Sequence, residues 1–502
     1  MLLVRRTARC AAALAVLAAC RAASPPELSQ LVVAYPSTLT VLHPALASDE
    51  FSYSISSNVY EPLVDMDAHE SLRPGLAVRW HNVDDLTWRF DLRPGAAFHD
   101  GRPVDASAVA ASLERARLDP ALRSVTSFEP VERFSAPSAS TVEVRTRFPV
   151  PDLAARLTEL GIWAEPARSG AALEGSGPYR VASWTPGGDV VLARVRGTGP
   201  ERLVFRAMPT AAERVDALRR GEVDLIAEVP AQQVAELRAA PGLRVVESRG
   251  LRVLFLGMNC EAAERADLAP PSNPFRDARV RRAVGLAIDR RALVDGPLGG
   301  FAEVLDQAVA PEVFGYAKDL PQLVHDPPES RRLLAEAGVA AGFETALDFV
   351  PGKYRDVERV VDALVADLGV VGIRVTPRPA AYPQFLDRVD RRDTPFYLRG
   401  WSTSVSAGQT YDILLRSPAG GFGSSNAGGY SNVELDALLE SAGREPDDAK
   451  RLAVLRRAAD IIRADMPLVP LYRQFNLYAV RSAVGFEPRL DRTVRGDEIS
   501  WR

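Results

Sequence analysis

A stretch of polar and aromatic residues at positions 400–432 has the side-chain types that a ligand-binding cleft uses. The chain as a whole is 25% charged, yet the only charged residues in this stretch are Asp412 and Arg416. Its serine, threonine, asparagine and glutamine side chains can form hydrogen bonds, and aromatic rings supply apolar contact area. The aromatic residues are Trp401, Tyr411, Phe422 and Tyr430. The composition is equally compatible with a mobile surface loop, so the position of the stretch in the fold has to decide.

Side chains that could perform catalysis form no recognisable arrangement in the sequence. The chain lacks the His-Glu-x-x-His, Gly-x-Ser-x-Gly and phosphate-loop motifs. Its five histidines are scattered at positions 43, 69, 81, 99 and 325. His99 and Asp100 are adjacent, but a turn explains both, because no other histidine lies nearby in a metal-ligand pattern. We therefore expect no enzyme activity, no catalytic residue, no metal site and no cofactor.

Length and composition predict a folded protein with more than one lobe. A chain of 502 residues exceeds what one hydrophobic core usually supports, so two or three lobes are expected. Apolar residues make up 47% of the chain and the formal net charge is only −4. Basic residues are matched by acidic ones, so we expect no binding to nucleic acid. Cys260 is the one cysteine in the body of the chain, and no disulfide is therefore expected.

The N-terminal segment has the pattern of a bacterial lipoprotein signal. Basic residues precede an apolar run at 11–19, which is too short for a stable membrane anchor but suits a secretory signal. Residues 17–20, Leu-Ala-Ala-Cys, resemble a lipobox, in which cleavage before the cysteine leaves that cysteine to be lipidated. We expect a signal peptide at 1–19, a lipidated Cys20 and an N-terminal linker at 20–30. The alternative is a plain signal peptide with a chance cysteine.

Short motifs between residues 60 and 104 carry the clearest family resemblance. They are Tyr-Glu-Pro-Leu-Val at 60–64, Arg-Pro-Gly-Leu-Ala at 73–77, Trp-Arg-Phe-Asp-Leu-Arg-Pro-Gly at 88–95 and Phe-His-Asp-Gly-Arg-Pro-Val at 98–104. Trp88, Phe90 and Leu92 alternate as one face of a strand. The order and spacing of the motifs resemble the extracytoplasmic solute-binding proteins of ABC importers for oligopeptides, dipeptides and nickel. Further segments extend the resemblance over nearly the whole mature chain, at 175–179, 279–290, 382–386 and 467–472.

The resemblance implies an α/β fold with two lobes, the periplasmic-binding-protein or Venus-flytrap architecture, and an extra α/β domain inserted in the first lobe. The expected segments are the first strand of lobe 1 at 31–41, the inserted domain at 42–171, the rest of lobe 1 at 172–258, lobe 2 at 259–474 and a return to lobe 1 at 475–502. A ligand between the lobes would stabilise a closed form, because only that form contacts it from both sides. The resemblance further implies an extracytoplasmic monomer, anchored to a membrane by lipid only, that delivers its ligand to ABC permease subunits.

The resemblance also assigns residues to the cleft. Tyr382 and Trp401 match positions that carry cleft aromatics in the family. Asp49, Glu50 and Phe51 match a segment at the cleft edge of the inserted domain, although a surface loop explains this segment equally well. The polar stretch adds the remaining expected ligand contacts, which are Ser402, Ser404, Gln409 and Tyr411.

Several ligands and functions remain open at this point. We expect a small solute, either peptide-like or another oligomeric or polar molecule, and oligosaccharides or metal chelates are alternatives for the same fold. A periplasmic sensor or chaperone-like scaffold is an alternative function without transport. A secreted hydrolase is a further alternative, although the sequence shows no site for it.

Ser404 marks a departure from the peptide-binding members of this family. Those proteins usually hold the free amino terminus of the peptide with an aspartate three residues after the tryptophan that matches Trp401. A serine hydroxyl offsets little of the several kcal/mol that desolvation of an unpaired ammonium group costs. We therefore expect a ligand other than an ordinary free peptide. The alternatives are an acid from elsewhere, such as Asp49 or Asp412, or a local shift in the match.

Overall fold

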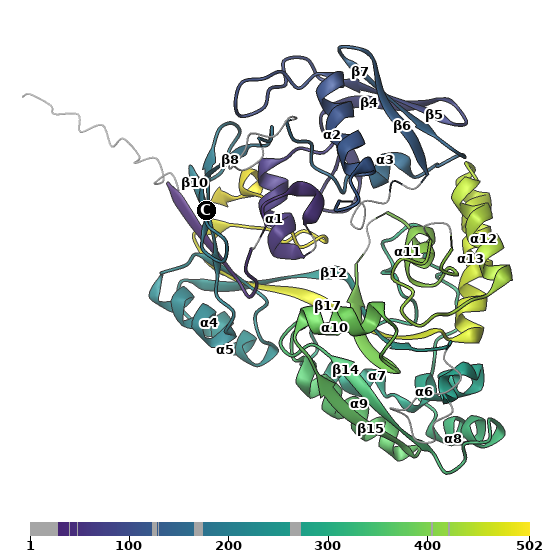
Figure 1. Cartoon of the computed structure of the whole chain (residues 1–502). Helices are drawn as coiled ribbons and strands as arrows, with labels where there is room; N and C mark the ends of the chain where they lie inside the picture. Colours follow the sequence, from purple (N-terminus) through teal and green to yellow (C-terminus); the bar gives the residue numbers. More distant parts are fainter. Residues whose placement is uncertain are drawn as a thin grey trace, which may run out of the picture.

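The chain folds into two lobes and a third unit inserted in lobe 1 (Figure 1). The computed structural model describes residues 29–502 except 40, 48, 123–127, 129, 165–173, 262–272, 403–404 and 420–421. The signal segment and Cys20 lie outside the described residues, as does Ser404. None of the helices in these described ranges has both the length and the apolar content that crossing a bilayer requires.

One mixed β-sheet runs through both lobes, with the strand order β15-β14-β16-β12-β17-β11-β1-β10-β9-β8. Its central strands, β12 (Leu243–Met258) and β17 (Leu468–Arg481), are antiparallel. The first half of β12 pairs with the second half of β17 in lobe 1, and the register shifts between Arg249 and Val253 before pairing resumes in lobe 2. The chain therefore crosses between the lobes inside β12 and inside β17. The expected border at 258–259 lies at the far end of β12, after that strand has entered lobe 2.

Lobe 1 has parallel strands at its centre. β1 has the nearly continuous apolar sequence Leu-Val-Val-Ala-Tyr because it lies between two parallel neighbours, β10 and β11, and packs against apolar clusters on both of its faces. The elements of this lobe are β1 (Gln30–Tyr35), β8 (Tyr179–Trp184), β9 (Val190–Arg194), β10 (Arg202–Ala207), α4 (Ala211–Arg220), β11 (Leu225–Ala227), η2 (Ala231–Gln233), α5 (Val234–Ala239), β18 (Val484–Gly485), η4 (Gly496–Glu498) and β19 (Ser500–Trp501).

The inserted domain is built on an antiparallel sheet with the strand order β4-β5-β7-β6, against which α2 packs. The alternation predicted for β5 is confirmed, because Trp88, Phe90 and Leu92 are 8%, 0% and 8% exposed. The elements here are η1 (Pro44–Leu46), α1 (Glu50–Val59), β2 (Val64–Met66), β3 (Leu72–Pro74), β4 (Ala77–Asp84), β5 (Thr87–Leu92), α2 (Ala106–Leu118), β6 (Val131–Ser138), β7 (Thr141–Thr146) and α3 (Leu153–Arg156).

Helix α1 joins the inserted domain to lobe 1. It falls within the expected insertion at 42–171, but its Phe51 ring lies 5.2 Å from the ring of Tyr35 in β1 and 6.3 Å from the ring of Phe205 in β10. A single buried apolar cluster includes these residues together with the core of the inserted domain. The two parts therefore share one core, which holds α1 in place at the edge of the interlobe space.

Lobe 2 continues the sheet on the other side of β12. β16 pairs with β12 in antiparallel fashion and with β14 in parallel, while β14 and β15 are parallel neighbours connected by α9. Its elements are η3 (Pro274–Arg276), α6 (Ala278–Ala287), α7 (Arg290–Asp295), β13 (Ala302–Val304), α8 (Pro327–Glu336), β14 (Phe343–Phe349), α9 (Val357–Val370), β15 (Ile373–Pro379), α10 (Tyr382–Asp390), β16 (Phe396–Trp401), α11 (Ala407–Leu414), α12 (Val433–Arg444) and α13 (Asp448–Asp465).

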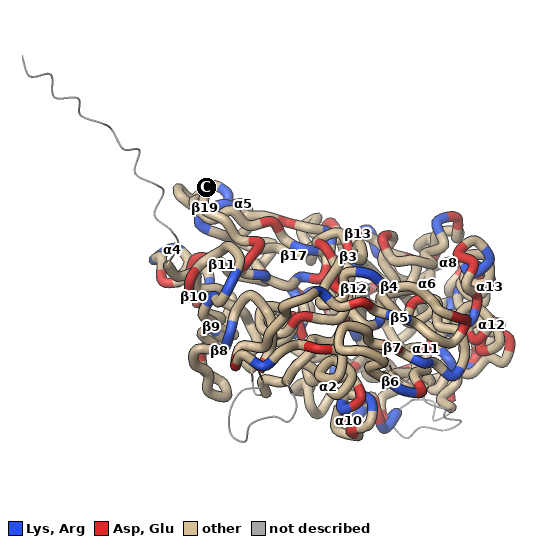
Figure 2. The backbone as a smooth tube through the Cα atoms, turned by 90° about the horizontal axis from the view of Figure 1, so that it is seen from above, with Lys and Arg blue, Asp and Glu red and all other residues tan. Residues whose placement is uncertain are grey.

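Charges of both signs are interspersed over the lobes (Figure 2). Arg473 is a buried arginine that is accompanied by acids. Arg473, which is 1% exposed, lies between the carboxylates of Glu303 and Glu312 at 2.8 and 2.5 Å. Such pairs hold segments of lobe 2 together where β13 meets β17.

Candidate ligand-binding cavity

A cavity of about 780 Å³ lies between the lobes, in the size range of small-molecule sites. Side chains from three parts of the chain line it: the inserted domain with α1, lobe 2, and the C-terminal segment at 490–495. Lobe 2 contributes the residues that follow β14 and the C-terminal end of β16, together with α10, α11 and α12. A ligand in this cavity would therefore touch both sides of the fold at once.

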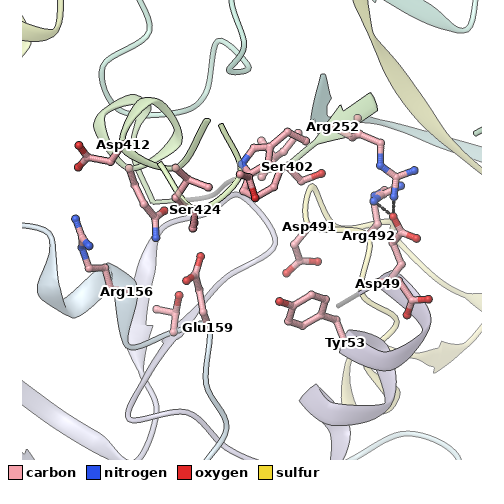
Figure 3. Close-up of a pocket in the computed structure, with 18 of the residues that line it drawn as sticks. Asp49, Tyr53, Arg156, Glu159, Arg252, Ser402, Asp412, Ser424, Asp491 and Arg492 are labelled. Atoms are coloured by element: carbon pink, nitrogen blue, oxygen red, sulfur yellow. Dashed lines mark ion pairs between the residues drawn. The ribbon is translucent and has the colours of Figure 1, made fainter. Parts of the chain in front are cut away.

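The end of the cavity next to the lobe crossing is organised around Glu50. Figure 3 shows its two partners there, Arg252 and Arg492. The Glu50 carboxylate forms ion pairs with Arg252 of β12 and with Arg492 of the C-terminal segment. Glu228 adds a second carboxylate, 3.5 Å from Arg492 and 4.0 Å from Arg252. The Glu50, Arg252 and Arg492 side chains are largely buried, and burial lowers the pKa of Arg252 to about 10. This network joins α1 to the β12 crossing and fixes the floor of the cavity.

Aromatic rings from lobe 2 form one wall of the cavity. Trp401 is the last residue of β16 and Tyr382 is the first residue of α10, so both stand at element ends that open on the cavity. Tyr354 supports this wall, because its hydroxyl accepts a hydrogen bond of 2.7 Å from the backbone N–H of Gly400. The Trp401 indole Nε1 is buried and has no hydrogen-bond partner among the described residues. A ligand oxygen at this position would satisfy it.

Two cations accompany the aromatic wall. Lys353 Nζ lies 4.0 Å from the centre of the Tyr382 ring, and the Arg399 guanidinium lies 5.4 Å from the centre of the Trp401 ring. Both line the cavity, and neither forms an ion pair with any described residue. Burial lowers the pKa of Lys353, while the nearby Asp49 acts in the opposite direction. An anionic ligand group would therefore find unpaired positive charge on this side.

The opposite end of the cavity lies between the inserted domain and α11. The Ser406 hydroxyl, which caps α11, donates a 3.3 Å hydrogen bond to Asp152. The Gln409 side chain donates a hydrogen bond to the carboxylate of Glu159, which follows α3. The inserted domain and lobe 2 are thus in contact here, in addition to the connection at the β12–β17 crossing.

Carboxyl groups at this end have raised pKa values. Desolvation by the surrounding protein raises the pKa of Glu159 to about 7, against the opposing effects of Arg156 and of the Gln409 hydrogen bond. Burial likewise raises the pKa of Asp412 to about 6, against the opposing effects of Arg416 and Arg156. Glu159 nevertheless keeps an exposed surface, and this surface faces the cavity.

The structure brings most of the predicted site residues together. Six of them line the cavity: Asp49, Glu50, Tyr382, Trp401, Ser402 and Gln409. Phe51 and Tyr411 do not, since each is 1% exposed and packs in an apolar core. The physical reason is helix phase. Phe51 lies on the face of α1 that packs against lobe 1, and Tyr411 lies on the face of α11 that packs into lobe 2. We therefore correct these two expectations and leave both residues out of the proposed site.

Sequence reasoning missed several lining residues. Arg252, Arg492 and Glu159 lie in segments without a polar or aromatic signature, and their role depends on partners that are distant in the sequence. Lys353 carried a usable signal, because it follows a Pro-Gly turn directly after a buried strand, where cleft residues gather in α/β proteins. Within the described residues, no group of three or more His, Cys, Asp and Glu side chains is placed to hold a metal ion.

Two lobes joined by crossing strands, with a polar and aromatic cavity between them, define a two-lobed solute-binding protein. The family model of the bacterial extracellular solute-binding proteins, family 5, matches residues 71–423. The chain therefore belongs to this family, whose members serve bacterial ABC importers.

Individual relatives agree with this assignment. The chain is 27% identical to the glutathione-binding protein GsiB of Escherichia coli O1:K1 over 91% of both chains. The structure is similar to a dipeptide-binding protein from Pseudoalteromonas sp. SM9913 in complex with Met-Leu, with a TM-score of 0.82 and 19% identity over 94% of this chain and 100% of the other. It is also similar to DppA from Helicobacter pylori in complex with the peptide STSA, with a TM-score of 0.80 and 22% identity over 94% and 98% of the two chains. These relatives are binding proteins, and their shared fold confirms the predicted architecture.

Proposed function

We propose that this protein captures a small peptide-like solute in the interlobe cavity and delivers it to a membrane permease. The observation that carries the proposal is the set of unpaired charges in a cavity lined from both lobes. Lys353 and Arg399 supply positive charge from lobe 2, and Asp49 supplies negative charge from the start of α1. A zwitterionic ligand that spans the cavity complements both and favours the closed form.

The roles of the lining residues follow from this charge arrangement. A ligand carboxylate would lie near Lys353 and Arg399, where it replaces water around otherwise unpaired cations. Trp401 and Tyr382 would contact the body of the ligand, with the Trp401 indole donating to a ligand oxygen. Ser402, next to Trp401, offers further hydrogen bonds at this wall, and Gln409 lines the opposite end of the cavity.

The ligand class is narrowed by Ser404 and by the named relatives. The prediction that the ligand is not an ordinary free peptide stays a prediction, because Ser404 lies outside the described residues. Asp49 and Asp412 both line the cavity, but Asp412 is already paired with Arg416 at 3.2 Å. A γ-linked peptide such as glutathione, the ligand in the name of the GsiB relatives, suits both the charge pattern and the changed position of the amino group.

The remaining parts of the proposal concern location and partners. We infer that the mature protein begins at Cys20, carries a lipid there, and works outside the cytoplasm as a monomer beside ABC permease subunits. The lipobox-like residues 17–20 and the family assignment support this.

Calorimetric titration of ligand-free protein tests the proposal. Glutathione, a mixed di- to pentapeptide library and neutral oligosaccharides serve as probes, and mass spectrometry identifies any molecule that copurifies. We expect micromolar binding of glutathione or of peptides. Lys353→Met should weaken this binding at least about tenfold, since a charge-assisted hydrogen bond is lost. Lys450→Met, the same change at an exposed lysine on α13, should leave it unaltered. Binding of oligosaccharides alone would refute a peptide-like ligand.

A further inference from the structure

We propose that Glu159 selects ligands that carry a cationic nitrogen at the end of the cavity between the inserted domain and α11. This inference rests on the proposed function and adds a specificity-determining residue to it. The chemistry required of the ligand is an ammonium or guanidinium group, which a peptide can supply from its amino terminus or from a basic side chain.

The position of Glu159 makes its carboxylate available to a ligand. Figure 3 shows Glu159 rising from the segment after α3 into the cavity, beneath Ser424 of lobe 2. Tyr53 of α1 faces the same space from the other side and interacts electrostatically with Glu159. The Gln409 hydrogen bond orients the carboxylate from α11 and leaves other acceptor positions on its oxygens open.

At this end of the cavity, Glu159 is the acidic lining residue that forms no ion pair with another described residue. Each arginine here already has an acid of its own. The pairs are Arg156 with Asp152 at 2.9 Å, Arg416 with Asp412 at 3.2 Å and Arg444 with Glu440 at 2.7 Å. A cation brought by the ligand would therefore meet negative charge that the protein itself has not neutralised, whereas a ligand carboxylate would be repelled.

The enclosure of Glu159 strengthens this selection. The pKa of Glu159 is raised to about 7 by crowding, with Arg156 lowering it and Asp152 raising it from the same segment. Because Glu159 keeps an exposed surface, water still screens part of such a pair, and the surrounding protein strengthens the attraction only moderately. The preference should therefore be strongest well above pH 7, stand at about half near pH 7, where half of the Glu159 carboxyl groups are protonated, and fade below that pH.

Three tripeptides with similar backbones and side chains show whether the cation comes from the amino terminus or from a side chain. Norleucyl-Ala-Ala carries only the terminal ammonium, N-acetyl-Lys-Ala-Ala carries only the side-chain ammonium, and N-acetyl-norleucyl-Ala-Ala carries neither. Titrated calorimetrically at roughly pH 7.5, where a terminal amine is still largely protonated, wild-type protein should bind one of the cationic peptides at least about tenfold more tightly than the neutral one. Which of the two binds more tightly identifies the source.

Variants then test whether Glu159 is responsible. Glu159→Gln keeps the shape and the Gln409 contact, and it should abolish the tenfold difference while leaving binding of the neutral peptide unchanged and without lowering the thermal unfolding midpoint. Asp390→Asn removes another carboxylate that lines the cavity, on α10, and should preserve the difference. Lowering the pH to about 5.5 should shrink the difference in wild-type protein and leave Glu159→Gln unaffected.

Three results would overturn the inference. Equal binding of the three peptides by wild-type protein would refute a cation preference and leave the proposed function intact. A tenfold difference that survives Glu159→Gln would show that another acid is responsible. Failure of glutathione and of every peptide to bind would overturn the proposed function, and this inference with it.

Discussion

Replacement of Trp401 tests whether its side chain contacts the ligand or mainly stabilises the fold. Trp401 ends β16, where its backbone pairs with Val253 of β12, and its half-buried side chain packs beside an apolar cluster of lobe 2. The indole Nε1 has no hydrogen-bond partner among the described residues. Trp401→Ala removes both ring contact and donor from a bound ligand, but it opens only a partial cavity in the fold.

The expected magnitudes follow from these contacts. Trp401→Phe keeps an aromatic ring but removes the N–H donor and part of the ring area, and it should weaken ligand binding by at least about 0.5–1.5 kcal/mol, the usual worth of one hydrogen bond. Trp401→Ala should cost more than about 1 kcal/mol, or more than about fivefold in Kd. The loss of stability should stay below the roughly 3–5 kcal/mol of a fully buried tryptophan.

Trp163→Ala provides the matched control. Trp163 is 0% exposed and its ring lies 5.0 Å from the His43 ring, within the core shared by lobe 1 and the inserted domain. Its replacement should cost about 3–5 kcal/mol of unfolding free energy. Urea unfolding without ligand and calorimetric titration with the tightest-binding probe measure both quantities for each variant. The reasoning is refuted if Trp401→Ala destabilises the fold as much as Trp163→Ala and the folded variant binds ligand with unchanged affinity.

Three further predictions concern the anchor, the charge network and pH. Cys20→Ser should move the protein, expressed with its own signal, from the detergent phase to the aqueous phase, because acyl chains contribute about 0.8 kcal/mol per buried CH₂; equal partitioning of both forms would contradict lipidation. Glu50→Gln should lower the unfolding free energy in urea by about 3–5 kcal/mol, since it leaves Arg252 and Arg492 buried with a weaker complement of acids, and a change below about 1 kcal/mol would contradict that reasoning. The pKa of Glu159 is about 7 in the folded protein against an ordinary value of 4.5, so the folded state holds the proton more tightly and stability falls as pH rises through this window. The urea midpoint of Glu159→Gln should therefore rise relative to that of the wild type as the pH increases from roughly 5 to 7. A difference between the two midpoints that does not change with pH would argue against the raised pKa.

The local sequence was sufficient to predict a feature wherever a single segment forms that feature by itself. The alternation of Trp88, Phe90 and Leu92 predicted β5, because side chains on a strand point to opposite faces in turn. Trp401 and Tyr382 line the cavity as predicted, because each stands at the end of an element that opens on the interlobe space. The order of short motifs along the chain was specific enough to predict the two-lobed fold that the family assignment confirms.

Tertiary structure alone decided which of two adjacent residues lines the cavity and which charged residues form ion pairs. Glu50 faces the cavity while the adjacent Phe51 is buried, because successive residues of a helix point about 100° apart and only the packing of α1 on lobe 1 sets which face is inward. Arg252 and Arg492 join Glu50 from opposite parts of the chain, since β12 and β17 carry the backbone through both lobes. Glu159 becomes a candidate selector only where α11 is brought against it from the other lobe. Long-range pairing of this kind depends on how the lobes close, which no local pattern encodes.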